Sequence, residues 1–226
     1  MPGALITHSQ IDGILMKPSD TGDVRDMYDE TAESYDQMMD QEIDLPVYAD
    51  TLGRLQLRLA GTPGLLIDTA CGSGHMLARY REQYEPDRPL LGIDLSPRMV
   101  AIAGAKLGPG ARIEIGDMRS LAAVDEGCAA AVLNFFAVHH LDPEEVQAAL
   151  GEWHRVLVSG GQLVLAAWEG AGPVDYGDES DLIALRYGAD ELNSWAQAAG
   201  FTVTRCVVEP VEDFPMDAVY LEAVKE

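Results

Sequence analysis

Short apolar runs alternate with amphipathic segments over most of this 226-residue chain. The runs have the length of strands, and most are bounded by glycine, proline or acidic residues, as buried strands commonly are. The predicted strands are residues 65–67, 90–94, 112–118, 129–136, 162–168, 201–208 and 220–224. Between them, apolar residues recur with helical spacing, which predicts helices that bury one face. This alternation predicts an α/β fold: a single doubly wound, mostly parallel seven-stranded sheet with helices on both faces.

Short polar residues followed by proline mark the starts of two helices. Ser96 and Asp142 each precede a proline. Such residues cap the free N–H groups of a helix, and proline fits its first position. The helix after Asp142 is expected to continue through Leu157 and to end at the glycine pair 160–161. A further helix is expected within residues 188–200.

A glycine-rich turn joins the first strand to the helix that follows it. The strand ends in Asp68, and the turn carries Gly72 and Gly74. Glycine lacks a Cβ atom, so a ligand can lie against the backbone, and the N–H groups of the helix start attract negative charge. Asp94 ends the second strand, twenty residues after Gly74, and Asp117 ends the third. Because nucleotide folds place a carboxylate on the ribose hydroxyls at this sheet edge, the spacing predicts a nucleotide site.

A dinucleotide site is the competing interpretation of this turn. Its fingerprint needs a third glycine for close packing of helix on strand, and Leu77 stands at that position. Asp68 precedes the turn, where it suits a cationic amino group better than a pyrophosphate. A Gly-Lys-Ser/Thr phosphate loop is absent from the sequence, which disfavours ATP chemistry.

Five motifs in order resemble those of the class I S-adenosylmethionine (SAM)-dependent methyltransferases. They are residues 67–74 (IDTACGSG), 92–97 (GIDLSP), 116–118 (GDM), 134–141 (NFFAVHHL) and 155–163 (RVLVSGGQL). The resemblance covers roughly residues 24–226 and implies SAM as the cofactor and a Rossmann-like methyltransferase fold. The first loop departs mildly from the family pattern, because residues 69–71 read Thr-Ala-Cys.

Two amphipathic helices, over residues 23–40 and 45–60, are expected before the first strand. In the family, a Tyr-Asp…Tyr-Asp segment such as the one at residues 28–36 often forms a lid over the cofactor. The resemblance therefore divides the chain into an N-terminal arm with lid helices, residues 1–60, and a SAM-binding Rossmann-like catalytic domain, residues 61–226.

The resemblance also implies which residues hold the cofactor. They are Tyr35, Asp68, Ala70, Gly72, Gly74, Asp94, Leu95, Met99, Asp117, Met118 and Asn134. The backbone of the turn is expected to hold the methionine portion beside Asp68. Asp94 has two oxygens for the two ribose hydroxyls, and Asp117 is expected at the adenine amino group. Leu95 and Met99 are expected to flank adenine. For Tyr35, contact with the ligand and simple packing of its helix stay equally open.

Methyl transfer from a sulfonium requires little acid–base chemistry, because the sulfonium is already a good leaving group. The site has to hold the nucleophile in line and exclude water. The resemblance places Asn134 under the sulfonium and Phe135 beside the transferred group, and an aromatic side chain such as Tyr176 can stabilise the cation. His139 or His140 is the first candidate for a base, although an orienting or capping role is as well supported.

Charge and composition narrow the partners. The formal net charge of −23 argues against DNA or RNA as a substrate, since a polyanion repels phosphate. Three cysteines without close spacing favour a reducing cytoplasm, and no secretion signal or membrane span is expected. The five histidines show no ligand spacing with acids, so no metal is expected. A monomer or homodimer with a small-molecule substrate is the expected state.

The predicted function is methyl transfer to a small-molecule acceptor, such as a natural-product intermediate or other metabolite. The nucleic-acid amino-methylation motif is absent, and Asn134 to Ala137 stand in its place. An alternative is a cyclase in which the amino group of SAM attacks its own Cγ, forming azetidine-2-carboxylate and releasing methylthioadenosine. A non-catalytic SAM-binding protein is the alternative of another class.

Overall fold

The computed structural model describes residues 17–174, 182–211 and 215–226. Its seven strands are β1 (Leu65–Asp68), β2 (Leu90–Asp94), β3 (Ala111–Ile115), β4 (Ala129–Phe135), β5 (Leu157–Trp168), β6 (Phe201–Pro210) and β7 (Asp217–Lys225). They form one sheet in the order β3-β2-β1-β4-β5-β7-β6. The pairs from β3 to β5 are parallel, whereas β7 runs antiparallel to both of its neighbours, so the sheet is mixed.

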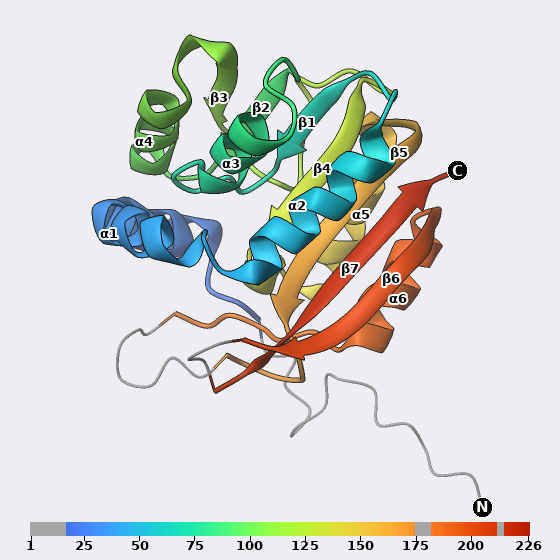
Figure 1. Ribbon diagram of the computed structural model, residues 1–226. Coiled ribbons are helices and arrows are strands. Elements are labelled where there is room, and N and C mark those ends of the chain that lie inside the picture. The colour runs from blue at the N-terminus through green and yellow to red at the C-terminus, as the bar shows by residue number, and fades with distance from the viewer. Residues whose placement is uncertain (1–16, 175–181, 212–214) are drawn as a thin grey trace, which may run out of the picture.

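Helices cover both faces of the sheet (Figure 1). The helices are α1 (Thr21–Glu42), α2 (Pro46–Leu59), α3 (His75–Gln83), α4 (Pro97–Leu107), α5 (Pro143–Val156) and α6 (Ala189–Ala198), with short 3₁₀ turns η1 (Gly108–Gly110) and η2 (Val138–His140). One apolar cluster joins α2, α3 and α4 to one side of the sheet, and another joins α5 and α6 to the other side. This arrangement confirms the doubly wound α/β prediction.

Local capping explains where two helices begin. Ser96 Oγ accepts a bond from Met99 N at 3.1 Å, and Asp142 caps α5 in a capping box with Glu145. Proline follows each cap, as the sequence predicts. α2 buries Leu52, Leu55 and Leu59 on one face, in line with the amphipathic helix predicted over residues 45–60.

The predicted end of α5 is wrong. The helix ends at Val156, and Leu157 has the extended dihedrals φ −71° and ψ 143° and begins a twelve-residue β5. Leu157 pairs with Ala129 of β4, and Cys128 N donates to Val156 O at 2.9 Å. Sheet pairing with a distant segment therefore overrides the local helical periodicity.

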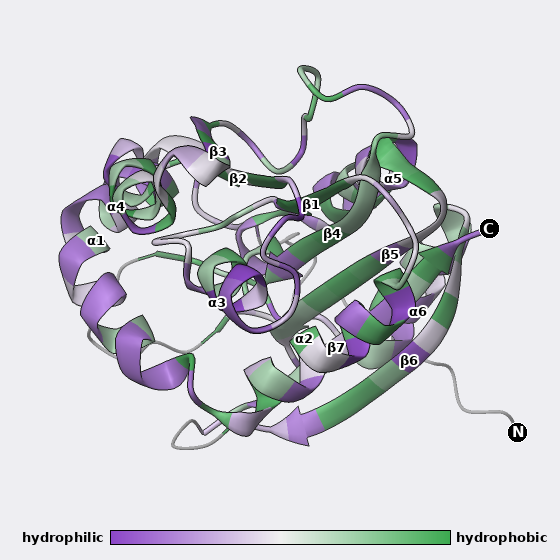
Figure 2. Cartoon of the chain, turned by 45° about the horizontal axis from the view of Figure 1, so that its top comes forward, coloured by the Kyte–Doolittle hydropathy of each residue, from purple (hydrophilic) through white to green (hydrophobic). Residues whose placement is uncertain are grey.

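α1 differs from the rest of the fold. Figure 2 shows that it is mostly hydrophilic, while the central strands are hydrophobic. It buries only Val24, Ala32 and Met39 and lies beside α4 (Figure 1). In the part of the chain that the structure describes, no helix combines the length and apolarity needed to cross a bilayer.

Candidate active site

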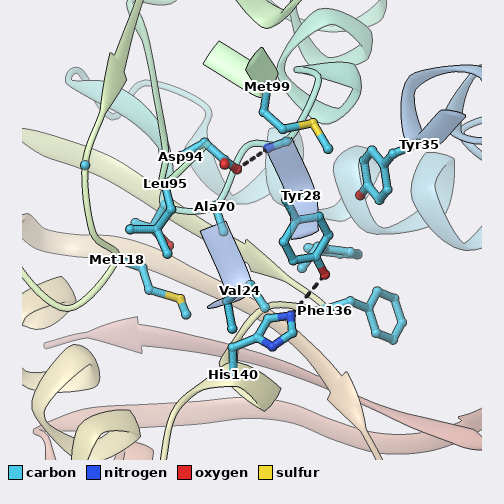
Figure 3. A pocket seen from close by; sticks show the side chains of 15 residues that line it. Val24, Tyr28, Tyr35, Ala70, Asp94, Leu95, Met99, Met118, Phe136 and His140 are labelled. Carbon is cyan, nitrogen blue, oxygen red and sulfur yellow. Dashed lines mark hydrogen bonds between the residues drawn. The ribbon is translucent and has the colours of Figure 1, made fainter. Parts of the chain in front are cut away.

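A cavity of about 570 Å³ opens at the carboxyl ends of β1, β2 and β4, beneath α1 (Figure 3). Its lining residues are Val24, Tyr28, Tyr35, Thr69, Ala70, Gly72, Asp94, Leu95, Met99, Gly116, Met118, Phe135, Phe136, Ala137 and His140. Eight of these belong to the residues predicted from sequence: Tyr35, Ala70, Gly72, Asp94, Leu95, Met99, Met118 and Phe135. The fold thus brings together segments predicted from separate motifs.

The glycine-rich turn is tied to the end of β2. Gly72 N donates to Asp94 Oδ2 at 2.8 Å, and Ser96 N donates to Asp94 Oδ1 at 2.9 Å. Burial raises the pKa of Asp94, although these backbone bonds oppose the shift. Gly74 has φ +85°, and a Cβ atom there would lie 3.0 Å from Ala103 Cβ. Glycine is therefore required for α3 to start against α4.

Asp68 lies at the end of β1 and is 3% exposed. The bond from Ala70 N is long, at 3.4 Å, and burial raises the pKa of Asp68 to about 7. A second cavity of about 400 Å³ reaches Asp68 and also contacts Tyr48 and His75. The two cavities share four lining residues, which are Tyr35, Ala70, Phe135 and Phe136.

Tyr35 covers the glycine turn from α1. A Cβ atom on Gly72 would approach Tyr35 Cε1 to 3.1 Å, so the ring rests on the backbone of the turn. Burial raises the pKa of Tyr35 well above its ordinary value, and the phenol is neutral. Tyr35 therefore packs its helix and lines both cavities, so neither of its predicted roles excludes the other.

The end of β4 is strained at Phe136. Its φ is +48°, which is the one positive value at a non-glycine residue in the described ranges. Its N–H group still donates to Ala166 O at 2.8 Å, and its ring lies 4.6 Å from that of Trp168, centroid to centroid. Strain of this kind persists only where the surroundings enforce it, and it concentrates at functional sites.

The two histidines after β4 have different positions. His140 lines the cavity, and its Nε2 atom lies 3.0 Å from Tyr28 Oη. His139 is buried outside the cavity lining, and its ring nitrogens have no hydrogen-bond partner among the described residues. Burial lowers the pKa of His139 well below its ordinary value and that of His140 to about 4, so both rings are neutral near pH 7. Of the two candidates for a base, His140 is the one that faces the cavity.

Three other predicted residues lie near the cavity without lining it, and a fourth lies outside the described chain. Asn134 is buried and donates to Thr69 Oγ1 at 3.0 Å. Asp117 lies in a turn after β3 and accepts bonds from Arg119 at 2.9 Å, and those bonds outweigh burial and lower its pKa. Gly74 serves the packing described above. Tyr176 lies outside the described residues.

Sequence reasoning did not assign several lining residues to the site. They are Val24, Tyr28, Thr69, Gly116, Phe136, Ala137 and His140, of which the sequence indicated only His140, as a candidate base. Val24 and Tyr28 are four residues apart on α1, so they share a helix face, and Tyr35 follows on the same face. This spacing in the sequence indicates that the three side chains point the same way from α1. Nothing local to Phe136 indicates its left-handed backbone.

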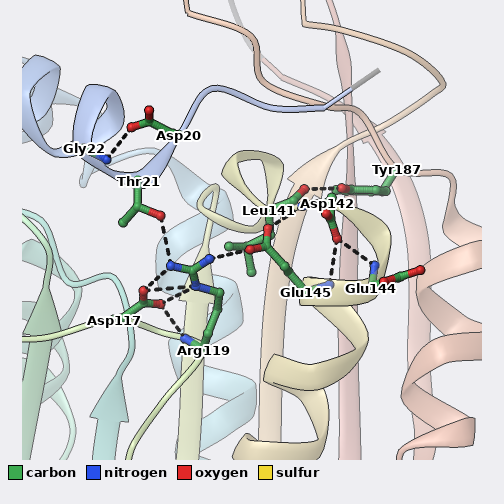
Figure 4. Close-up of polar contacts among 10 residues, drawn as sticks. All are labelled: Asp20, Thr21, Gly22, Asp117, Arg119, Leu141, Asp142, Glu144, Glu145 and Tyr187. Atoms are coloured by element: carbon green, nitrogen blue, oxygen red, sulfur yellow. Dashed lines mark hydrogen bonds and ion pairs between the residues drawn. The ribbon is translucent and has the colours of Figure 1, made fainter. Parts of the chain in front are cut away.

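Besides the contact between Tyr28 and His140, polar contacts attach α1 to the domain at three places. Arg119, which binds Asp117, also donates to Thr21 Oγ1 at 2.9 Å and pairs with Glu145 (Figure 4). Asp29 accepts bonds from Ser96 Oγ at 2.8 Å and Arg98 N at 2.9 Å, at the start of α4.

The third attachment is a cluster at the other end of α4. Asp36, Asp40 and His75 place their ligand-type atoms within 4.8 Å of one another, an arrangement that the sequence did not predict. Lys106 Nζ lies 2.7 Å from Asp36 Oδ1 and 2.6 Å from His75 Nε2. The chain therefore supplies its own cation between these groups.

Comparison with known proteins agrees with this architecture. A family model described as a methyltransferase domain matches residues 66–161. A carboxy-S-adenosyl-L-methionine synthase of Chromohalobacter salexigens is 34% identical over 131 residues, or 54% of this chain and 47% of that protein. A 23S rRNA (guanine(748)-N(1))-methyltransferase of Streptomyces fradiae is 34% identical over 106 residues, or 47% and 34%. The chain thus spans half or less of the length of these curated relatives.

Among solved structures, the 1,6-didemethyltoxoflavin-N1-methyltransferase of Burkholderia thailandensis has the same fold. Its TM-score is 0.71 at 22% identity, and the match covers 95% of this chain and 93% of that chain. The chain therefore has the Rossmann-like fold of that solved structure, and its residues 66–161 match a methyltransferase domain. The methyltransferase-domain match supports the predicted class of SAM-dependent transferase and the predicted cofactor.

Proposed function

We propose that the protein binds SAM across the two cavities and transfers its methyl group to a small-molecule acceptor. The observation that carries this proposal is the pair of carboxylates on either side of the glycine turn, the buried Asp68 and the half-buried Asp94. No ion pair is recorded for either within the described ranges, and each accepts bonds from backbone N–H groups. SAM carries an ammonium group for one carboxylate and ribose hydroxyls for the other, so the donor set fits it.

When bound, SAM supplies an electrophilic methyl group on a sulfonium. The chain's part is to position the reactants and exclude water. In this proposal Leu95, Met99 and Met118 enclose the adenine, and Asn134 holds the end of β4 through Thr69. Phe135 and Phe136 present aromatic faces to the cation. His140, rather than the buried His139, is the group that can accept a proton from the acceptor.

A small acceptor suits this cavity better than a macromolecule. α1 contributes Val24, Tyr28 and Tyr35 to its walls, which narrows the space beside the cofactor. The formal net charge of −23 opposes a phosphate backbone, in contrast to the RNA named for the Streptomyces fradiae relative. We therefore favour a metabolite or natural-product acceptor, acted on by a monomer or homodimer in the cytoplasm.

Intramolecular cyclisation is a second candidate, favoured by the state of Asp68. With a pKa of about 7, this carboxylate can take a proton from the SAM ammonium group. The freed amine would then form a bond to Cγ while the Cγ–sulfur bond breaks and methylthioadenosine leaves. The second cavity, with Asp68 among its lining residues, provides a place for the methionine portion.

Identification of the adenosine product separates these functions. The purified protein is incubated with SAM, first alone and then with a panel of small acceptors. S-adenosylhomocysteine that forms only with an acceptor supports methyl transfer, and methylthioadenosine without an acceptor supports cyclisation. Tight SAM binding with neither product supports a non-catalytic SAM-binding protein, and calorimetry without any SAM binding overturns all three.

A further inference from the structure

The larger cavity contains a phenol that the chain itself supplies. Tyr28 Oη lies 3.0 Å from His140 Nε2, and the two rings meet edge-on with centroids 5.4 Å apart. Figure 3 shows Tyr28 extending from α1 across the cavity toward His140, with Asp94 on the opposite side. An aromatic ring with its hydroxyl against the imidazole is therefore already accommodated in this space.

The walls around Tyr28 select for an uncharged aromatic occupant. Phe136 lies against Trp168 with a centroid distance of 4.6 Å, and Tyr35 lies 6.2 Å from Tyr28. Among the lining side chains, Asp94 already binds the glycine turn, and His140 is neutral. A charged acceptor would lose its hydration without gaining a partner, which is costly.

Building on the proposed function, we propose that the Tyr28 ring stands where the methyl acceptor binds. The acceptor is then a small, uncharged aromatic compound that carries a hydroxyl or ring N–H group. α1 is held largely by polar contacts, so Tyr28 can withdraw and leave its place beside His140 Nε2 to the acceptor.

The transfer balances for a phenolic acceptor. The phenol oxygen forms a bond to the methyl carbon, and the carbon–sulfur bond breaks with its electron pair left on sulfur. The hydroxyl proton passes to His140 Nε2 and from there to solvent. The products are an aryl methyl ether and S-adenosylhomocysteine.

The test uses p-cresol, which is the tyrosine side chain as a free molecule, and toluene, which lacks the hydroxyl. Their dissociation constants are measured by ligand-observed NMR, with and without S-adenosylhomocysteine. We expect p-cresol to bind about 3- to 10-fold more tightly than toluene, as one net hydrogen bond allows. In His140→Leu this preference should vanish.

Substitution of Tyr28 tests whether its hydroxyl competes with the acceptor for His140. Tyr28→Phe removes its hydrogen bond to His140, so p-cresol affinity should rise by about threefold or more. Tyr84→Phe is the matched control, because Tyr84 Oη donates to Ala49 O at 2.9 Å away from the cavity lining. It should leave p-cresol affinity unchanged.

Two results overturn the inference. One is equal affinity for p-cresol and toluene in the wild-type protein. The other is weaker p-cresol binding in Tyr28→Phe, which would make Tyr28 part of the acceptor site rather than its substitute. Both results are measured on the wild-type protein and on Tyr28→Phe, so the inference can be overturned even if His140→Leu does not fold. SAM calorimetry on the wild-type protein tests the proposed function separately, since SAM can bind while p-cresol shows no preference.

Discussion

The two halves of the cavity are built in different ways. On the side of β1 and β2, Asp94 accepts hydrogen bonds from the backbone N–H groups of Gly72 and Ser96. The register of β1 on β2 fixes where these groups lie. On the side of α1 and the end of β4, side chains meet across long sequence separations, as Tyr28 and His140 do over 112 residues. We call these the cofactor half and the acceptor half.

The comparison shows how rigidity and adaptability can be combined in one site. The cofactor half lies on a sheet whose neighbouring strands are buried on both faces. The acceptor half includes α1, which is attached mainly by hydrogen bonds and ion pairs that water and salt weaken. A change in the cofactor half should therefore cost more than a comparable change in the acceptor half.

The largest effect is expected for Asp94→Ala. This substitution removes the carboxylate that binds Gly72 N and Ser96 N, together with its proposed bonds to ribose. Two charge-assisted bonds are worth about 3 kcal/mol or more, so SAM affinity should fall by at least about 100-fold. Calorimetry with SAM measures this loss. Asp217→Ala, an exposed position at the start of β7, is the control and should bind SAM normally.

Asp68→Asn should have the next largest effect, about tenfold on SAM affinity, because it removes a charge opposite the ammonium group. Burial raises the pKa of Asp68 from 3.8 to about 7. Between these values the folded protein holds a proton that the unfolded chain has released, so the free energy of unfolding falls as pH rises toward 7. The variant should lack that slope and be more stable than wild type at pH 7.

Paired measurements make this prediction specific. Thermal or denaturant unfolding from pH 4 to 8 gives the slope, and SAM calorimetry from pH 6 to 8 gives the binding. Wild-type affinity should rise with pH as Asp68 loses its proton, whereas Asp68→Asn should show a flat profile. Identical pH profiles for the two proteins would contradict a role for this carboxylate.

The two halves also differ in how far the sequence predicts them. Gly72, Asp68 and Asp94 follow from local rules, because a glycine turn after a buried strand and acids at strand ends need no knowledge of distant partners. Tyr28 was placed correctly on a helix, but its contact with His140 depends on how α1 docks. Phe136 gives no local signal, since a bulky residue with positive φ is held there by Ala166 and Trp168.

The two errors in the fold have different causes. Strand 112–118 was predicted too long, because Asp117 is drawn into a turn by Arg119 rather than into a ladder. Leu157 continued the apolar helical spacing of α5, yet β4 offers it a sheet partner. At Asp117 a local side-chain–backbone bond closes a turn, whereas at Leu157 a tertiary contact overrides a weak local preference.

Phe136→Leu tests the acceptor half directly. The substitution removes ring contacts with Trp168 and Tyr220, so the free energy of unfolding should fall by about 1–2 kcal/mol. Because the proposed function also turns this ring toward the SAM cation, SAM affinity should fall by about two- to fivefold. The affinity for p-cresol should fall by about fivefold or more. Phe201→Leu is the matched control, since Phe201 packs on His154 in the cluster under α5 and α6.

That control separates stability from binding. Phe201→Leu should lower the free energy of unfolding by a similar amount and leave p-cresol affinity unchanged. If both variants weaken p-cresol equally, the loss reflects general softening of the domain, and Phe136 has no special place in the acceptor half.

The smallest effect is expected for Lys106→Met, which acts on the attachment of α1. Lys106 and Asp36 are each about a quarter exposed and pair at 2.7 Å. A partly exposed ion pair contributes about 0.2–1 kcal/mol, so amide hydrogen exchange in α1 should quicken by about 1.4- to 5-fold. Arg25→Met is the control, because Arg25 pairs with Asp26 inside α1 and does not attach it.

The location of this faster exchange shows whether α1 opens separately from the sheet. Faster exchange confined to α1, present in Lys106→Met and absent in Arg25→Met, would mean that α1 opens as a unit while the sheet stays closed. Higher salt should reproduce part of that effect in the wild-type protein, because it screens the same pair. Exchange that quickens equally in α1 and in β1 would instead place α1 within the cooperative unit of the domain. Tyr28 would then have no route out of the cavity short of unfolding.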